Sequence, residues 1–82
     1  MKYLCKRSCR DNFCLMFICS DIEAVREYVR FQNGEGWIYG YDYTIEEYDD
    51  NHPPVWAEGQ TVTEWTPEET REVIRQLSEA NP

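Results

Sequence analysis

The chain has 82 residues, of which 41% are hydrophobic and 15% aromatic, and its formal net charge is −8. A chain of this length forms one domain, taken here as residues 1–82, and its apolar content excludes wholesale disorder. The negative charge disfavours direct binding to nucleic acid or to an anionic membrane, and it favours a positively charged protein partner.

The N-terminal segment predicts a β-hairpin, with strands over residues 2–9 and 13–19 and a turn at Arg10, Asp11 and Asn12. The second strand is apolar on both faces, which is typical of a central strand, whereas the charged first strand is typical of an edge or near-edge position. The apolar run of the second strand is too short to span a bilayer, and no signal-peptide cleavage site follows it. We therefore expect a cytoplasmic protein, located in the host cell if a phage encodes it.

All four cysteines of the chain lie in this hairpin, at Cys5, Cys9, Cys14 and Cys19. The C-x3-C-x4-C-x4-C spacing lacks the C-x2-C pairs of zinc sites, so we expect no cofactor and favour small apolar fillers of a reduced core. A two-residue turn at Asp11 and Asn12 would place Cys9 opposite Cys14, where a disulfide could form, whereas a three-residue turn would not. A metal site at Cys5, Cys9 and Cys14 is the remaining alternative.

An amphipathic helix is expected over about residues 21–32. Ser20 and Glu23 have the spacing of a capping box, and Asn33-Gly34 is typical of a helix end. A second helix is expected from Thr66-Pro67, with Glu69 completing its capping box, to about residue 79. Asn81-Pro82 is expected to stop it.

Between the helices, residues 37–48 alternate like a strand. Trp37, Tyr39, Tyr41, Tyr43 and Ile45 share one face, which we expect to lie under the helices as core. Residues 49–54 form a loop, and 60–64 a short further strand. The resulting order, ββαββα, predicts an α+β fold with one mostly antiparallel sheet and both amphipathic helices on one face of it.

The acidic stretch of this region is the candidate partner-binding surface. Its carboxylates would face solvent, a nearby tyrosine would serve as an interface anchor, and further acids would extend the surface. The candidate residues are Asp42, Glu46, Glu47, Tyr48, Asp49, Asp50, Glu58 and Glu64. No catalytic or phosphate-binding motif accompanies them, so we do not expect an enzyme.

The sequence thus predicts a small acidic inhibitor or adaptor that binds stoichiometrically to a larger basic protein, such as a nucleic-acid-binding complex. Small phage proteins directed against host defence enzymes, including anti-CRISPR proteins and nucleic-acid mimics, are of this kind, although no motif here assigns the chain to one of them. A redox- or metal-sensitive regulatory domain built on the cysteine hairpin is the alternative. A homodimer through exposed tyrosines is a third.

Overall fold

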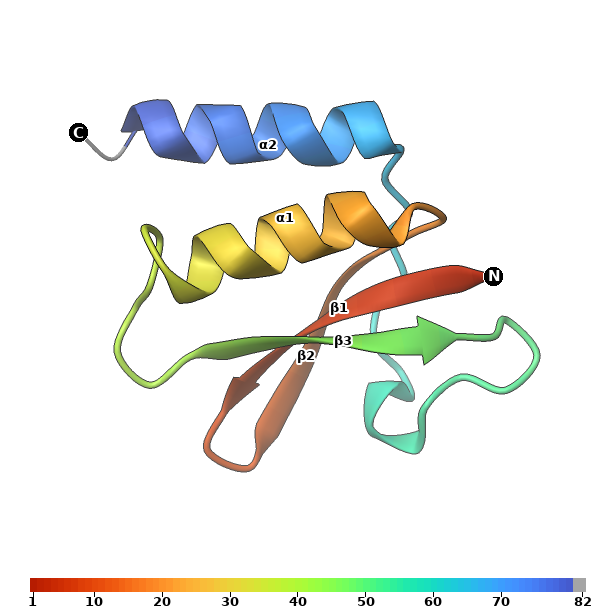
Figure 1. The fold of residues 1–82 in the computed structure, drawn as a ribbon. Coiled ribbons are helices and arrows are strands. Elements are labelled where there is room, and N and C mark those ends of the chain that lie inside the picture. Colours follow the sequence, from red (N-terminus) through yellow and green to blue (C-terminus); the bar gives the residue numbers. More distant parts are fainter. Residues whose placement is uncertain (81–82) are drawn as a thin grey trace.

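The computed structural model, which describes residues 1–80, is a three-stranded antiparallel sheet with two helices on one side of it (Figure 1). This confirms the predicted α+β class. In chain order the elements are β1 (Lys2–Cys9), β2 (Asn12–Cys19), α1 (Ile22–Asn33), β3 (Asp42–Tyr48), a short 3-10 helix η1 (Val55–Ala57) and α2 (Pro67–Ala80). The expected stop at Asn81-Pro82 lies outside the described residues.

The strand order is β2-β1-β3, so the first strand is central and the second is an edge, opposite to the expectation. The expectation for β1 rested on its charges, which would protect an exposed edge, but Lys2 and Lys6 serve another purpose. They are instead paired with acids of later segments. The apolar β2 is an edge in the sheet, yet side chains from both faces of the fold cover it.

The hairpin turn matches neither of the two registers considered. Cys9 pairs with Asn12, which leaves Arg10 and Asp11 as the two turn residues, and Arg10 has a φ of 56°. Cys14 consequently lies opposite Arg7 rather than Cys9. Farther along, the register passes from Lys6↔Leu15 to Cys5↔Phe17, so one residue of β2 is bulged.

The main core lies between the sheet and the helices, and aromatic rings dominate it. The Phe17 ring stacks on Trp65 with centroids 4.2 Å apart and meets Tyr28 edge-on at 4.9 Å. Tyr28 comes from α1, and Tyr43 of β3 completes the cluster at 6.1 Å from it. Such offset and edge-to-face pairs add to the free energy gained by burying the rings.

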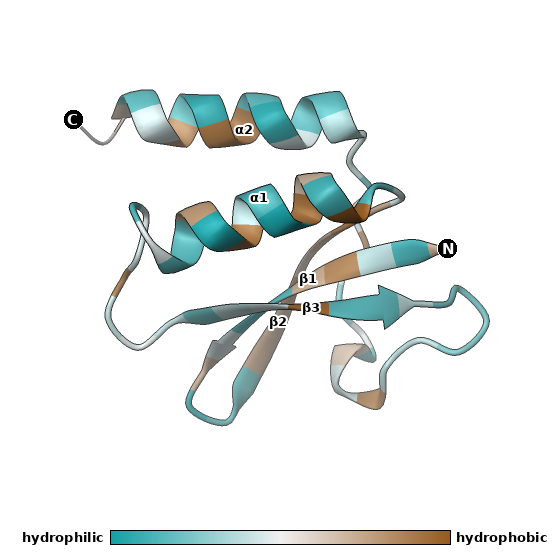
Figure 2. Cartoon of the chain, viewed as in Figure 1, coloured by the Kyte–Doolittle hydropathy of each residue, from teal (hydrophilic) through white to brown (hydrophobic). Residues whose placement is uncertain are grey.

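The helices are amphipathic, as expected, and Figure 2 shows their apolar residues as brown bands among teal ones. Asp21 rather than Ser20 caps α1, because its Oδ1 accepts a 3.0 Å hydrogen bond from the Glu23 amide. The predicted capping box of α2 is confirmed: Glu69 N donates to Thr66 Oγ1 at 3.0 Å, and Thr66 N donates to Glu69 Oε1 at 3.1 Å.

A second, smaller core lies on the opposite face of the sheet, where the sequence had suggested solvent. The segment after β3 returns beneath the sheet, and Trp56 and Ala57 of η1 pack there. The buried side chains of this core are Leu4, Leu15, Ile18, Tyr48 and Ala57. The expected strand at 60–64 is reduced to a single parallel bridge between Glu64 and Ile18.

The strand expected from residue 37 begins only at Asp42. Trp37 and Tyr39 were assigned to the core but are 50% and 88% exposed. The reason is the side chain of Asn33, at the end of α1, which hydrogen-bonds the backbone of Tyr43. The eight residues 34–41 between α1 and β3 must therefore double back as a loop, and Gly40 adopts a φ of 92° within it.

Gln60 fastens the returning segment to β2. Its Oε1 accepts a 2.9 Å hydrogen bond from Leu15 N, and its Nε2 donates to the carbonyls of Phe13 at 2.9 Å and Trp56 at 3.2 Å. Backbone hydrogen bonds of Ile18 with Thr63 and Trp65 hold the far end of the segment, and the Gln60 amide holds its middle beside η1. The smaller core therefore depends on this amide.

Replacing this amide by Gln60→Ala should lower the free energy of unfolding by about 1–3 kcal/mol, since it leaves part-buried backbone groups unpaired. Urea denaturation measures the change. Gln76→Ala is the matched control, because Gln76 makes only one exposed 3.4 Å hydrogen bond. Equal stability of the two variants would contradict this role of Gln60.

Candidate protein-binding surface

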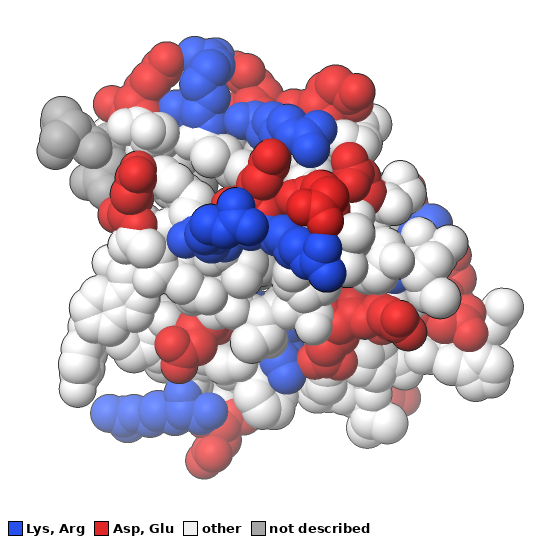
Figure 3. Space-filling view, in the orientation of Figure 1, with Lys and Arg blue, Asp and Glu red and all other residues white. Residues whose placement is uncertain are grey.

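Negative charge is concentrated in the segment from β3 to the start of α2. Residues 42–64 contain seven acids and no lysine or arginine: Asp42, Glu46, Glu47, Asp49, Asp50, Glu58 and Glu64. In Figure 3 red atoms dominate the right-hand side below the helices, where β3 ends. This region therefore has the strongest unbalanced charge of the molecule.

The helices carry acids too, but arginines pair with many of them. Arg71 Nε lies 2.8 Å from Glu27 Oε2 across the two helices. Within α2, Arg75 bridges Glu72 and Glu79. Figure 3 accordingly shows blue and red atoms interleaved over the helices. Such a mixed surface has a weaker long-range field than the segment below it.

Lys2 gathers two of the candidate acids at the start of β1. Its Nζ lies 3.1 Å from Glu64 Oε1 and 3.3 Å from Asp50 Oδ2. The hydrogen bonds that Lys2 donates to these two carboxylates, Glu64 first, raise its pKa. The loop after β3 and the segment before α2 are thus brought together although they are distant in sequence.

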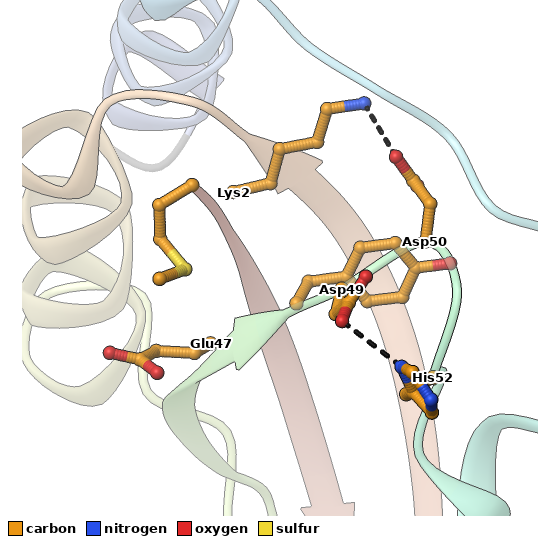
Figure 4. Close-up of a pocket in the computed structure, with 7 residues that line it drawn as sticks. Lys2, Glu47, Asp49, Asp50 and His52 are labelled. Atoms are coloured by element: carbon orange, nitrogen blue, oxygen red, sulfur yellow. Dashed lines mark hydrogen bonds and ion pairs between the residues drawn. The ribbon is translucent and has the colours of Figure 1, made fainter.

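Around this point lies an open hollow of about 520 Å³, lined by Met1, Lys2, Glu47, Tyr48, Asp49, Asp50 and His52. Asp49 accepts a 2.9 Å hydrogen bond from Asn51 N and lies 3.2 Å from His52 Nδ1. These contacts, the backbone one first, lower the pKa of Asp49. Figure 4 shows Glu47 pointing away from Asp49 and His52, so the carboxylates do not converge on one point.

We call Glu47, Asp49, Asp50 and Glu64 the acidic end. It places four carboxylates around the end of β3 against a single lysine, Lys2. Asp42, at the other end of β3, and Glu58, after η1, are exposed but lie outside it.

Two other candidate residues are engaged within the fold. Glu46 lies 2.8 Å from Lys6 Nζ, which also sits 4.7 Å from the Phe13 ring centroid. Tyr48 is only 7% exposed, because η1 covers the face to which its ring points. Its ring packs in the smaller core and is not presented as an interface anchor.

The lysines of β1 were missed as parts of the surface. Lys2 pairs across the sheet with Tyr48, and Lys6 with Thr44. Had β1 been placed beside β3, this register would have put both lysines next to the acids. The alternating lysines of β1 were visible in the sequence, but their pairing with the acids could be inferred only with knowledge of the strand order.

The structure does not gather the cysteines. All four are free thiols, with Cys5 and Cys19 buried and Cys9 and Cys14 half-buried. Cys5 and Cys9 are four positions apart on one strand, which is about 13 Å. Residues 1–80 contain no group of three or more His, Cys, Asp or Glu side chains that could hold a metal ion.

Comparison of the chain with known protein families, curated proteins and solved structures found no match. Neither of the two described helices is long and apolar enough to cross a membrane. The functional argument consequently rests on the geometry and charge of the molecule itself.

Burial raises the pKa of the Cys5 thiol from 9.0 to about 12. As the pH rises above 9, the unfolded chain loses this proton before the folded protein does, so the thiol's contribution to stability is lost progressively up to the folded pKa. The free-energy advantage of the wild type over Cys5→Ala should fall by about 2 kcal/mol between about pH 8 and 10.5.

Urea denaturation of both proteins across this pH range measures the change. Val25→Ala is the control, because it also removes buried apolar volume but no titrating group. If the difference in free energy of unfolding between the wild type and Cys5→Ala stays constant with pH, the thiol ionises in the folded protein as it does in water.

Proposed function

We propose that this protein acts by stoichiometric binding, with the acidic end engaging a positively charged surface on a larger protein. The observation that carries the proposal is the unequal pairing of charge. The helix acids are interleaved with four arginines, whereas residues 42–64 hold seven acids and no lysine or arginine. Within residues 1–80, Lys2 and Lys6 are the lysines that pair with these acids, both from β1.

Such a surface steers an oppositely charged partner into contact. Complementary charge raises the association rate, and screening by salt lowers it, because the Debye length is only about 8 Å at physiological ionic strength. The acids of the acidic end are exposed, with side chains of Asp49, Asp50 and Glu64 between half and two-thirds accessible. Their charge is thus available to a partner at little cost in desolvation.

In its sharper form, the proposal makes the partner's surface a nucleic-acid-binding groove and the protein an inhibitor that occupies it. In the acidic end, Glu47 and Asp49 are two positions apart, which is about 7 Å on an extended chain, and Asp50 and Glu64 lie around Lys2 beside them. A groove that binds phosphates would attract this cluster of negative charges. Inhibitors that phages direct against host nucleases, in the cytoplasm, would act in this manner; charge alone supports this form of the proposal.

Binding is favoured over catalysis because the polar groups of the hollow do not form a reaction centre. The side chain of His52 is 84% accessible, and its described partner is the exposed Asp49. General acid–base catalysis requires groups positioned in a site that excludes water.

The test compares two triple variants with the same change in net charge. Glu47→Gln, Asp49→Asn and Asp50→Asn neutralise the acidic end, and Asn at position 49 keeps the oxygen that Asn51 N requires. Glu23→Gln, Glu68→Gln and Glu79→Gln are the matched control on the helices. Tagged proteins would capture partners from lysate of the source cell or host at low and high salt.

We expect one main partner that the wild type and the helix triple retain at low salt. High salt, added DNA or RNA, or neutralisation of the acidic end should each release it, with a loss of at least about tenfold in captured partner. Equal retention by both triples, or a complex that survives high salt, would contradict the proposal.

A further inference from the structure

The outer edge of β3 is closed at one residue only. β3 pairs with β1 on its inner side. On its outer side, Asn33 Nδ2 donates to the Tyr43 carbonyl at 2.9 Å, and Tyr43 N donates to Asn33 Oδ1 at 2.9 Å. The asparagine side chain therefore imitates one residue of a neighbouring strand.

The contact between Asn33 and Tyr43 shows which way the other backbone N–H and C=O groups of β3 point. In an antiparallel strand, alternate residues direct both N–H and C=O to the same side. Because those of Tyr43 point outward, those of Ile45 and Glu47 point outward too. Within residues 1–80 these four groups have no hydrogen-bond partner. We call them the open edge; Figure 1 shows β3 in front of the sheet, with no other element before it.

The other edge of the sheet is treated differently. Ile18 N, on β2, donates to the Thr63 carbonyl at 2.8 Å, and Trp65 N donates to the Ile18 carbonyl at 2.9 Å. The backbone closes the β2 edge at Ile18, and the Gln60 side chain pairs with Leu15 N and the Phe13 carbonyl farther along it. The acidic edge has no such second contact within residues 1–80.

We propose that the open edge accepts an extended basic segment of the protein partner as a fourth strand. The segment would pair with the backbone of Ile45 and Glu47, and its Lys or Arg side chains would lie beside Glu47 and Asp49. Main-chain hydrogen bonds provide affinity in such strand addition, and flanking side chains provide selectivity. This inference rests on the proposed function and specifies how the partner binds.

Charge selects a basic segment over a second copy of this chain. β3 contains three acids, Asp42, Glu46 and Glu47, and no lysine or arginine. Pairing two copies edge to edge would bring two such acidic strands together, and like charges across strands are destabilising. A partner strand with basic residues at alternate positions would instead place opposite charges beside each other, and these attract.

The loop before β3 offers the partner an apolar contact at the other end. Trp37, Ile38 and Tyr39 are 50%, 58% and 88% exposed, and the two rings meet edge-on with centroids 5.9 Å apart. Exposed aromatic residues are common anchors of protein interfaces. The segment is therefore expected to combine basic residues beside the acidic end with an apolar residue beside this loop.

The probe is a capped seven-residue peptide of alternating valine and lysine. Its control has the central valine replaced by proline, which keeps the charge but breaks strand pairing. Calorimetry should show at least about tenfold tighter binding of the first peptide. Amide hydrogen exchange, followed by NMR, should slow at Ile45 and Glu47 on binding and remain unchanged at Thr44 and Glu46.

Two variants separate backbone pairing from charge. Glu47→Gln removes the carboxylate but retains the N–H, whereas Glu47→Pro removes both. Proline is tolerated on an edge strand where its N–H would face outward. We expect Glu47→Pro to bind the valine–lysine peptide about tenfold more weakly than Glu47→Gln. The exchange measurement on the wild type does not depend on either variant folding.

The outcomes distinguish this inference from the proposed function. Equal binding of both peptides, abolished by neutralising the acidic end, would overturn strand addition and leave electrostatic binding intact. Binding of neither peptide would contradict strand addition, whereas the capture experiment decides the proposed function separately. Protection of Ile45 and Glu47 that increases with protein concentration and without peptide would identify a second copy as the occupant and overturn the choice of a basic segment.

Discussion

The structure depends on how a sheet of only three strands satisfies its two edges. An unpaired edge exposes a row of backbone donors and acceptors, which a small protein must cover, charge or use. Here the β2 edge is bridged at Ile18 by the segment entering α2, and the β3 edge is bridged at Tyr43 by Asn33. These two contacts determine where the chain turns back, and they leave the C-terminal half of β3 as the available backbone edge.

Closing the β2 edge also explains why both faces of the sheet hold core. To reach Ile18, the chain must cross beneath the sheet after β3, and that crossing places η1 against Leu4, Leu15 and Tyr48. The crossing segment carries Asp50 and Glu64, the two acids that Lys2 meets from β1. The same path therefore supplies the smaller core and the acidic end, so fold and candidate function share one origin.

The sequence was informative where the determinants were local. Thr66 and Glu69 identified the second helix start, and the apolar periodicity identified both helices. It was misleading where a distant partner decided the outcome. Trp37 and Tyr39 alternate as a strand would, but the contact between Asn33 and Tyr43 forces that stretch into a loop. Tyr48 looked exposed because nothing in its neighbourhood shows that η1 packs over it. The acidic composition was visible at once, whereas its pairing with β1 lysines required the strand order.

The outer edge of β3 is closed at Tyr43 and open beyond it. Amide hydrogen exchange of the free protein, in dilute solution, measures this residue by residue. We expect slow exchange at Tyr43, Thr44 and Glu46, and fast exchange at Ile45 and Glu47. Slow exchange at Ile45 and Glu47 in a monomer would show that another part of the chain covers the edge. Exchange at Tyr43 as fast as at Ile45 would show that Asn33 does not hold it.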